Sequence, residues 1–181
     1  ENYFMYCGSS DYLETINFII EGFEKSNTKS KLLLVINGSQ KSMKVVNDRI
    51  NRSIYKNNIT VKSYLPKDLL WNYYKNALAL LIPLNFNQRD KARFPHKIGE
   101  YCAVGRPIMT SDWGEIPVYF QNNENAILLR NNDAKELGNA LDVIENEPEL
   151  RQKLGQGALK LAQEHFDYKL YGTGILKFVN Q

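Results

Sequence analysis

Charged side chains of both signs fall close together between Arg93 and Glu100. Lys97 and Glu100 lie three residues apart, so on a helix they share one face. Pro95, just upstream, interrupts any earlier helix and favours one that begins after it. One interpretation of Glu100 is an acid that the helix dipole favours and that pairs with Lys97. The alternative is a ligand site, in which these fixed charges hold a polar or charged molecule.

Two further segments have the composition of ligand-binding loops. Residues 8–11, Gly-Ser-Ser-Asp, are small and polar and precede an expected helix, where free amides and the helix dipole favour a phosphate. They match neither G-x-G-x-x-G nor a phosphate-binding loop with its lysine, so a simple helix cap is an equal alternative. Residues 111–117 contain Gly114, which indicates a close backbone approach or a sharp turn. A plain turn with a helix cap at Ser111 or Asp112 is the alternative there.

Apolar runs and helix-periodic segments alternate along the chain, and these elements must position the candidate loops. Strands are expected at 3–7, 32–36, 59–64, 78–84, 107–110 and 126–129. Helices are expected from 12, at 39–55, 66–74 and 97–104, from 133 to about 145, from 148, and at 168–179, with 85–95 irregular. This alternation predicts one α/β domain over residues 1–181, a doubly wound parallel sheet of about six strands with helices on both faces.

Three residues mark the expected ends of helices. Gly105 suits the position after a helix, Asp133 suits an N-cap, and Pro148 suits the first turn of the next helix. Ligands of doubly wound sheets bind beyond the carboxyl ends of the strands. The candidate loops are therefore those after residues 7, 37, 64, 84 and 110.

The composition argues against several functional classes. Lys and Arg together number 23 and Asp and Glu 20, so the net charge of +3 is too small for a nucleic-acid surface. No apolar stretch approaches the roughly 20 residues that cross a bilayer. His96 and His165 stand alone, and Cys7 and Cys102 lie far apart, which predicts no metal site and two buried free thiols in a reducing compartment. We expect a cytoplasmic protein, associated at most peripherally with the inner face of a membrane.

The run from Phe94 to Pro117 resembles the C-terminal signature of group 1 (family 4) glycosyltransferases. The family's Glu, Ala-x-Gly-(Lys/Arg)-Pro and Ser-Asp-x-Gly-Gly-x-Pro elements correspond to Glu100, residues 103–107 and residues 111–117. Residues 20–23, 63–66, 123–129, 133–141 and 148–151 are similar to other parts of the same domain. The resemblance implies the Rossmann-like C-terminal half of a GT-B fold, which binds the donor nucleotide sugar. The absent N-terminal half would hold most of the site for a glycan or lipid-linked acceptor.

The resemblance also implies which residues bind the donor. Glu100 matches the glutamate that binds the ribose hydroxyls, and Tyr64 and Leu65 match the strand end that meets the base. The loop that faces the diphosphate is matched by Gly8, Ser9 and Ser10. The family is retaining and usually needs no metal, and we expect no cofactor besides the donor substrate.

The cations of the implied site come from the segment before Glu100. A branch of the family carries Phe-Pro-x-Lys there, as this chain does, which places Phe94, Pro95 and His96 in the donor site. Arg93 and Lys97 are the implied catalytic residues, because charge builds on a leaving diphosphate and must be neutralised.

The chain departs from the family pattern at three positions. In an ungapped match, the family's diphosphate-binding Arg and Lys fall at Ser9 and Glu14, and the first Glu of its paired-glutamate motif falls at Ala92. A retaining glycosyltransferase domain, inactive without its other half, is the first interpretation. A module that keeps the fold and has lost catalysis, and a nucleotide-sugar epimerase of the same fold, are the alternatives.

Overall fold

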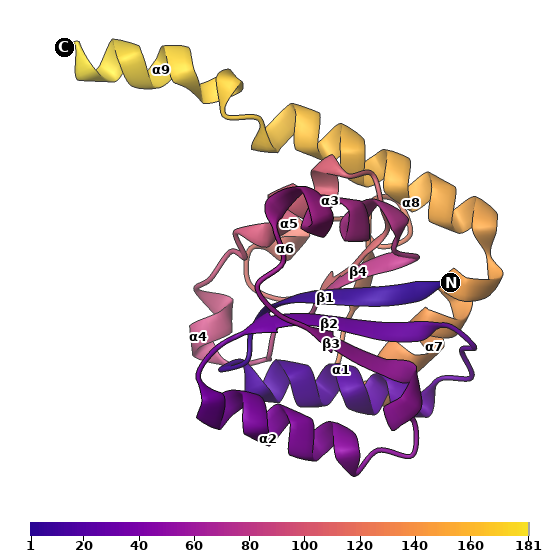
Figure 1. The fold of residues 1–181 in the computed structure, drawn as a ribbon. Helices are drawn as coiled ribbons and strands as arrows, with labels where there is room; N and C mark the ends of the chain where they lie inside the picture. Colours follow the sequence, from indigo (N-terminus) through magenta and orange to yellow (C-terminus); the bar gives the residue numbers. More distant parts are fainter. Residues whose placement is uncertain (181) are drawn as a thin grey trace.

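The computed structural model describes residues 1–180, without the side chain of Thr173, so the last residue of the expected 1–181 domain lies outside it. Six strands in this part of the chain form one sheet in the order β3-β2-β1-β4-β5-β6 (Figure 1). The strands are β1 (Tyr3–Ser9), β2 (Lys31–Asn37), β3 (Ile59–Lys62), β4 (Ala79–Ile82), β5 (Ile108–Ser111) and β6 (Ile127–Leu129). All neighbouring pairs are parallel, which confirms the predicted fold class.

Helices cover both faces of the sheet. They are α1 (Leu13–Lys25), α2 (Gln40–Asn51), α3 (Lys67–Asn76), α4 (Gln88–Lys91), α5 (Lys97–Ala103), α6 (Ile116–Tyr119), α7 (Ala134–Asn146), α8 (Pro148–Leu161) and α9 (Lys169–Val179). A 3-10 turn at Lys56–Asn58 precedes β3, and a π-helical turn at Ala162–Phe166 follows α8. Helices α1, α2 and α7 lie below the sheet in Figure 1, and α3, α5, α6 and α8 lie above it.

Side chains of β1 alternate between these two layers, as the period of a strand requires. Phe4 and Tyr6 pack with α1, α2 and α7, whereas Met5 and Cys7 pack with α3, α5 and α6. The free cysteines Cys7 and Cys102 are both buried in the second layer, as predicted.

The strand order reverses between β1 and β4. From β1 the chain adds β2 and β3 on one side, and β4, β5 and β6 extend the sheet on the other. A crevice at such a reversal is where doubly wound sheets bind ligands. Residue Ser9 ends β1 and Ile82 ends β4, so the loops that follow them border this point.

The boundary signals of the sequence hold in most places. Gly105 has a φ of 63° directly after α5 and its C-cap. Asp133 caps α7 by accepting a hydrogen bond from the Lys135 amide at 2.8 Å, and Pro148 begins α8. The alternative of a cap at Ser111 or Asp112 is wrong, because no side chain caps α6.

The expected irregular stretch at 85–95 instead contains a short helix. Helix α4 forms because the Asn87 side chain accepts a hydrogen bond from the Asp90 amide at 2.8 Å and so caps its first turn. Residues 116–119 also form a short helix, α6, that the sequence pattern does not indicate. Strand β1 runs two residues further than expected, so Gly8 and Ser9 lie in the strand rather than in the loop after it.

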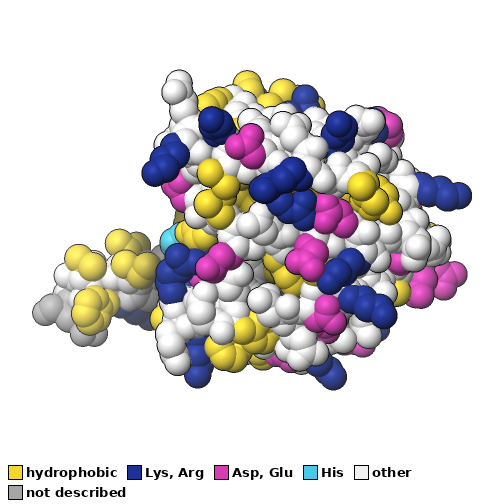
Figure 2. Space-filling model, turned by 90° about the horizontal axis from the view of Figure 1, so that it is seen from below, with side chains coloured by type: hydrophobic (Ala, Val, Ile, Leu, Met, Phe, Trp, Pro, Cys, Tyr) yellow, Lys and Arg dark blue, Asp and Glu magenta, His cyan; other side chains and the backbone are white. Residues whose placement is uncertain are grey.

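Helix α9 extends away from the rest of the fold (Figure 1). Its exposed apolar side chains appear on the projecting segment in Figure 2. They are Leu170, Tyr171, Ile175, Leu176, Phe178 and Val179. On the body of the face in Figure 2, basic and acidic side chains are interspersed rather than gathered by sign. No helix among the described residues is both long and apolar enough to cross a membrane.

Candidate functional site

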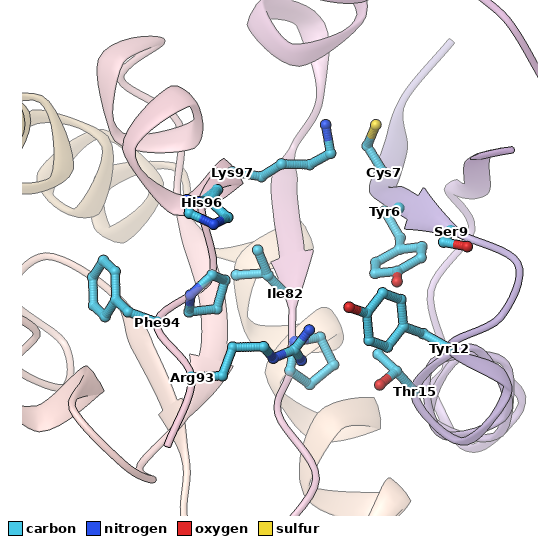
Figure 3. Close-up of a pocket in the computed structure, with 13 residues that line it drawn as sticks. Tyr6, Cys7, Ser9, Tyr12, Thr15, Ile82, Arg93, Phe94, His96 and Lys97 are labelled. Carbon is cyan, nitrogen blue, oxygen red and sulfur yellow. The ribbon is translucent and has the colours of Figure 1, made fainter. Parts of the chain in front are cut away.

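A pocket of about 400 Å³ lies at the switch point, between the carboxyl ends of β1 and β4 (Figure 3). Two segments that are far apart in the sequence form its walls: the end of β1 with the start of α1, and the end of β4 with residues 93–97. Its lining residues are Tyr6, Cys7, Gly8, Ser9, Tyr12, Thr15, Ile82, Pro83, Arg93, Phe94, Pro95, His96 and Lys97. The candidate residues of the first strand end and of the 93–97 segment are thus brought together.

The wall formed by β1 depends on the absence of a side chain at Gly8. A Cβ atom at this position would collide with the ring and hydroxyl of Tyr6, which lies two residues earlier on the same face of the strand. Gly8 therefore leaves room for the Tyr6 ring along the pocket wall. Burial raises the pKa of the Tyr6 hydroxyl well above its ordinary value, so the group stays a neutral phenol that can donate a hydrogen bond.

Arg93 reaches the pocket from the opposite wall and pairs there with a carboxylate. Its Nη2 lies 3.2 Å from Oδ1 of Asp90, a carboxylate with no exposed surface. Its guanidinium carbon lies 4.7 Å from the centroid of the Tyr12 ring. Figure 3 shows the guanidinium turned toward Tyr12, between the two walls. Arg93 is thus held in place by a carboxylate on one side and an aromatic ring on the other.

Lys97, at the first position of α5, is the less constrained cation of the pocket. It lies within no ion pair formed by the described residues, and its ammonium group extends toward Cys7 (Figure 3). Glu100 lies in the first turn of α5 and is exposed, but the described residues contain no Lys97–Glu100 ion pair. The interpretation of Glu100 as the partner of Lys97 is therefore wrong. His96 lines the same wall one residue earlier.

Ser10 does not face the pocket. Its side chain is completely buried, and its Oγ lies 2.7 Å from Oγ of Ser42 on α2. Its amide donates to the Asn37 carbonyl at 2.9 Å. Ser10 ties the end of β1 to the neighbouring strand and helix, and its hydroxyl is engaged there.

Tyr64, Leu65 and Glu100 lie outside the residues that line the pocket. Tyr64 is 76% exposed and has a φ of 53°, a left-handed conformation that is uncommon for an aromatic residue. Its amide donates to Oδ1 of Asn37 at 2.7 Å, which holds the segment after β3 against the end of β2. This places Tyr64 at the same carboxyl edge of the sheet as the pocket, with β2 between them.

The loop after β5 supports the wall that carries Arg93. Trp113 donates from its indole Nε1 to the Asn87 carbonyl at 3.2 Å and packs on Phe86 at 5.0 Å between ring centroids. Gly114 has a φ of 63°, and a Cβ atom there would lie 2.7 Å from the Lys91 carbonyl. Both reasons for a glycine, a turn and a close backbone approach, therefore apply at this position.

Sequence reasoning missed Tyr6, Tyr12, Thr15 and Asp90. Tyr6 lies on β1, Tyr12 is the N-cap residue of α1 and Thr15 lies in its first turn. Only the strand order shows that they face residues 93–97. Asp90 carries a signal that was available: Asn87 and Asp90 are spaced like an N-cap and the acid three residues after it. No three His, Cys, Asp or Glu residues of the described chain gather in a way that would hold a metal ion.

The sheet order and the pocket at its reversal define a Rossmann-like α/β domain. Residues 1–161 match the sequence model of the family "Glycosyl transferases group 1", and the chain belongs to this family. A search of curated proteins found no match.

Solved structures with the same fold include larger glycosyltransferases. Sucrose-phosphate synthase from Thermosynechococcus elongatus superposes with a TM-score of 0.87 at 19% identity, covering 100% of this chain and 45% of that one. Anabaena HepE in complex with UDP-glucose superposes with a TM-score of 0.83 at 15% identity, covering 99% of this chain and 49% of that one. The C-terminal domain of a group 1 family glycosyl transferase from Francisella tularensis superposes with a TM-score of 0.73 at 12% identity, covering 92% of this chain and 86% of that one. The chain thus spans about half the length of the first two proteins, which makes it similar to one half of a GT-B fold.

Proposed function

We propose that this glycosyltransferase group 1 domain binds the donor of a retaining enzyme. The enzyme would transfer a sugar from a nucleoside diphosphate to a glycan or lipid-linked acceptor. The observation that carries the proposal is the convergence of Arg93 and Lys97 on a pocket at the switch point of the sheet. A structural neighbour, HepE, has been solved with UDP-glucose, which supports a nucleotide sugar as the ligand.

In this proposal the diphosphate lies against the wall formed by residues 93–97. Lys97 supplies positive charge that lies in no ion pair of the described residues, whereas Arg93 shares the Asp90 carboxylate with Arg89. Such charge stabilises a leaving diphosphate, and the first turn of α5 places Lys97 at the pocket. Glu100, exposed on the same helix, would bind the ribose hydroxyls, and the base would extend toward Tyr64 and Leu65 along the carboxyl edge of the sheet.

The proposed enzyme needs a second half. Glycosyltransferases of this fold close their site between two domains, and this chain covers 45% of one such neighbour and 49% of another. The exposed apolar side chains of α9 would pack against that second half. We therefore expect this chain alone to bind the donor nucleotide without turning it over.

The pairing of Arg93 with a buried carboxylate favours one other function, a nucleotide-independent binding module that has lost catalysis. Ser9 and Glu14 stand where the resemblance places the family's diphosphate-binding cations, and Glu14 is exposed beside the pocket region. A module of this kind would keep the fold without affinity for a nucleoside diphosphate.

Calorimetric titration of the chain with UDP, GDP, ADP and CMP separates the two functions. We expect one preferred nucleotide, with affinity at least about tenfold lower in Lys97→Ala, the loss of one charge-assisted contact. Glu100→Ala should also weaken binding, through the ribose. Lys44→Ala and Glu149→Ala, at exposed positions on α2 and α8, are the matched controls and should bind like wild type. Wild-type protein that binds none of the four nucleotides would favour the binding module.

A further inference from the structure

Asp90 is a charged residue with no exposed surface, and its contacts use both carboxylate oxygens. Its Oδ2 accepts from the amide of Asn85 at 2.9 Å and from the side-chain Nδ2 of Asn85 at 3.1 Å. Its Oδ1 lies 3.2 Å from Nη2 of Arg93 and 3.4 Å from Nε of Arg89. A carboxylate tolerates full burial only when it is paired and hydrogen-bonded in this way.

These contacts connect the two walls of the pocket. The Nδ2 atom of Asn85 also donates to Oγ1 of Thr15 at 3.2 Å, and Thr15 lies on α1 and lines the pocket. Tyr12, one turn earlier, places its ring 4.7 Å from the guanidinium carbon of Arg93. Asp90 therefore joins the loop after β4 to the start of α1 at the pocket.

The guanidinium of Arg93 is fixed at one corner and on one face. Among the described residues its only ion-pair partner is Asp90, and its Nε is buried without a hydrogen-bond partner. A planar guanidinium held between a carboxylate and a ring keeps one orientation, and Arg93 lines the pocket in this orientation.

We propose that Asp90 is a positioning residue, which orients Arg93 toward the distal phosphate of a nucleoside diphosphate through the Asp90–Arg93 contact and the Tyr12 ring. The inference rests on the proposed function, since it assigns a role within the same donor site. Asp90 touches no ligand in this arrangement. Its effect on binding passes entirely through the orientation of Arg93.

The test measures how much the second phosphate contributes to binding. Affinities for UDP and UMP, and for GDP and GMP, are determined by calorimetry in wild type and in Asp90→Asn. The diphosphate-to-monophosphate affinity ratio should fall about tenfold in Asp90→Asn, because Arg93 loses the group that orients it. Asp48→Asn, at an exposed position on α2, is the matched control and should leave the ratio unchanged.

Three more variants separate the effect of orientation from the effects of charge and of folding. Asp90→Glu keeps the negative charge but moves it by one methylene, so the ratio should still fall. Arg93→Gln should lower the ratio to the same level, and adding Asp90→Asn to it should cause no further fall. This double variant also removes the uncompensated charge that destabilises Asp90→Asn alone, and thermal unfolding of each variant confirms that binding is measured on folded protein.

The outcomes distinguish the two proposals. A ratio that is unchanged in Asp90→Asn and Asp90→Glu, with wild type binding a diphosphate, overturns the positioning role and leaves the donor site standing. A ratio that rises in Asp90→Asn shows that Asp90 only neutralises Arg93, and also overturns the role. Wild-type protein that binds no nucleotide overturns the proposed function and this inference with it.

Discussion

Replacing Gly114 by alanine should destabilise the fold in two separable ways. The φ of 63° at Gly114 is left-handed, which costs a residue with a Cβ about 1–2 kcal/mol. The new Cβ would also lie 2.7 Å from the carbonyl oxygen of Lys91 and 3.3 Å from its carbonyl carbon. Backbone atoms of α4 would have to move to relieve this contact, at a further cost of about 1–3 kcal/mol.

The sum, about 2–5 kcal/mol of unfolding free energy, corresponds to a fall in Tm of about 5–15 °C for a domain of this size. Two other glycines separate the cost of the left-handed backbone from the cost of the steric contact. Gly105 shares the φ of 63°, but its nearest contact would lie at 3.7 Å, so Gly105→Ala should lose only about 1–2 kcal/mol. Gly99, inside α5, would meet only Phe166 at 3.7 Å, and Gly99→Ala should lose nothing or gain up to about 1 kcal/mol.

Urea unfolding followed by circular dichroism measures all three variants against wild type. The expected order of stability is Gly99→Ala, then Gly105→Ala, then Gly114→Ala. If Gly114→Ala loses no more than Gly105→Ala, the backbone of α4 does not lie against Gly114. The loop after β5 would then not support the wall of the pocket as described.

Two partly buried carboxylates give further predictions. Burial alone would raise the pKa of Glu145, but hydrogen bonds from Ser30 and from the Lys29 amide bring it below its ordinary value. Because the pKa of Glu145 is lower in the folded than in the unfolded protein, its ionised form stabilises the fold at pH values above the unfolded pKa. This stabilisation is lost as the pH falls through the folded pKa. The stability gap between wild type and Glu145→Gln in urea should therefore shrink from pH 7 to pH 3; a constant gap would contradict the pKa shift. Arg49 binds Glu24 through two parallel contacts at 2.9 and 2.7 Å. Arg49→Lys should cost about 0.5–1 kcal/mol in the same assay, and no loss would show that the paired geometry adds nothing.

The strands could be predicted because apolar runs in the sequence indicate that they are buried. The run at 32–36 is buried on both faces of the central sheet, as continuous apolar residues indicate. Helix ends at Gly105, Asp133 and Pro148 were predictable for an equally local reason, since each residue fits one cap position. Long-range partners are not needed to recognise either signal.

Helix α4 and the contacts around it could not be predicted in this way. Gln88, Arg89, Asp90 and Lys91 are all polar, so no apolar periodicity marks a helix. Charged residues are almost never fully buried unless paired, and the pairing of Asp90 with Arg93 becomes visible only once Asn85 and Tyr12 are placed around it. Residues 93–97 face the end of β1 across the pocket, although the two segments lie more than 80 residues apart in the sequence. This proximity depends on the sheet order and could not be predicted locally either.

The placement of charge in the pocket follows from this geometry. The resemblance aligns the family's diphosphate-binding cations with Ser9 and Glu14, on the side of β1 and α1, and that side carries no cation among the pocket-lining residues. Arg93 and Lys97 approach from the other wall instead, and Arg93 shares the Asp90 carboxylate with Arg89. Lys97 would then attract a diphosphate with a charge that is unpaired within the part of the chain that the structure describes, while Arg93, held by Asp90, would contribute directed hydrogen bonds. Salt should therefore weaken the contribution of Lys97, which lies in no ion pair of the described residues, more than that of Arg93, which Asp90 holds.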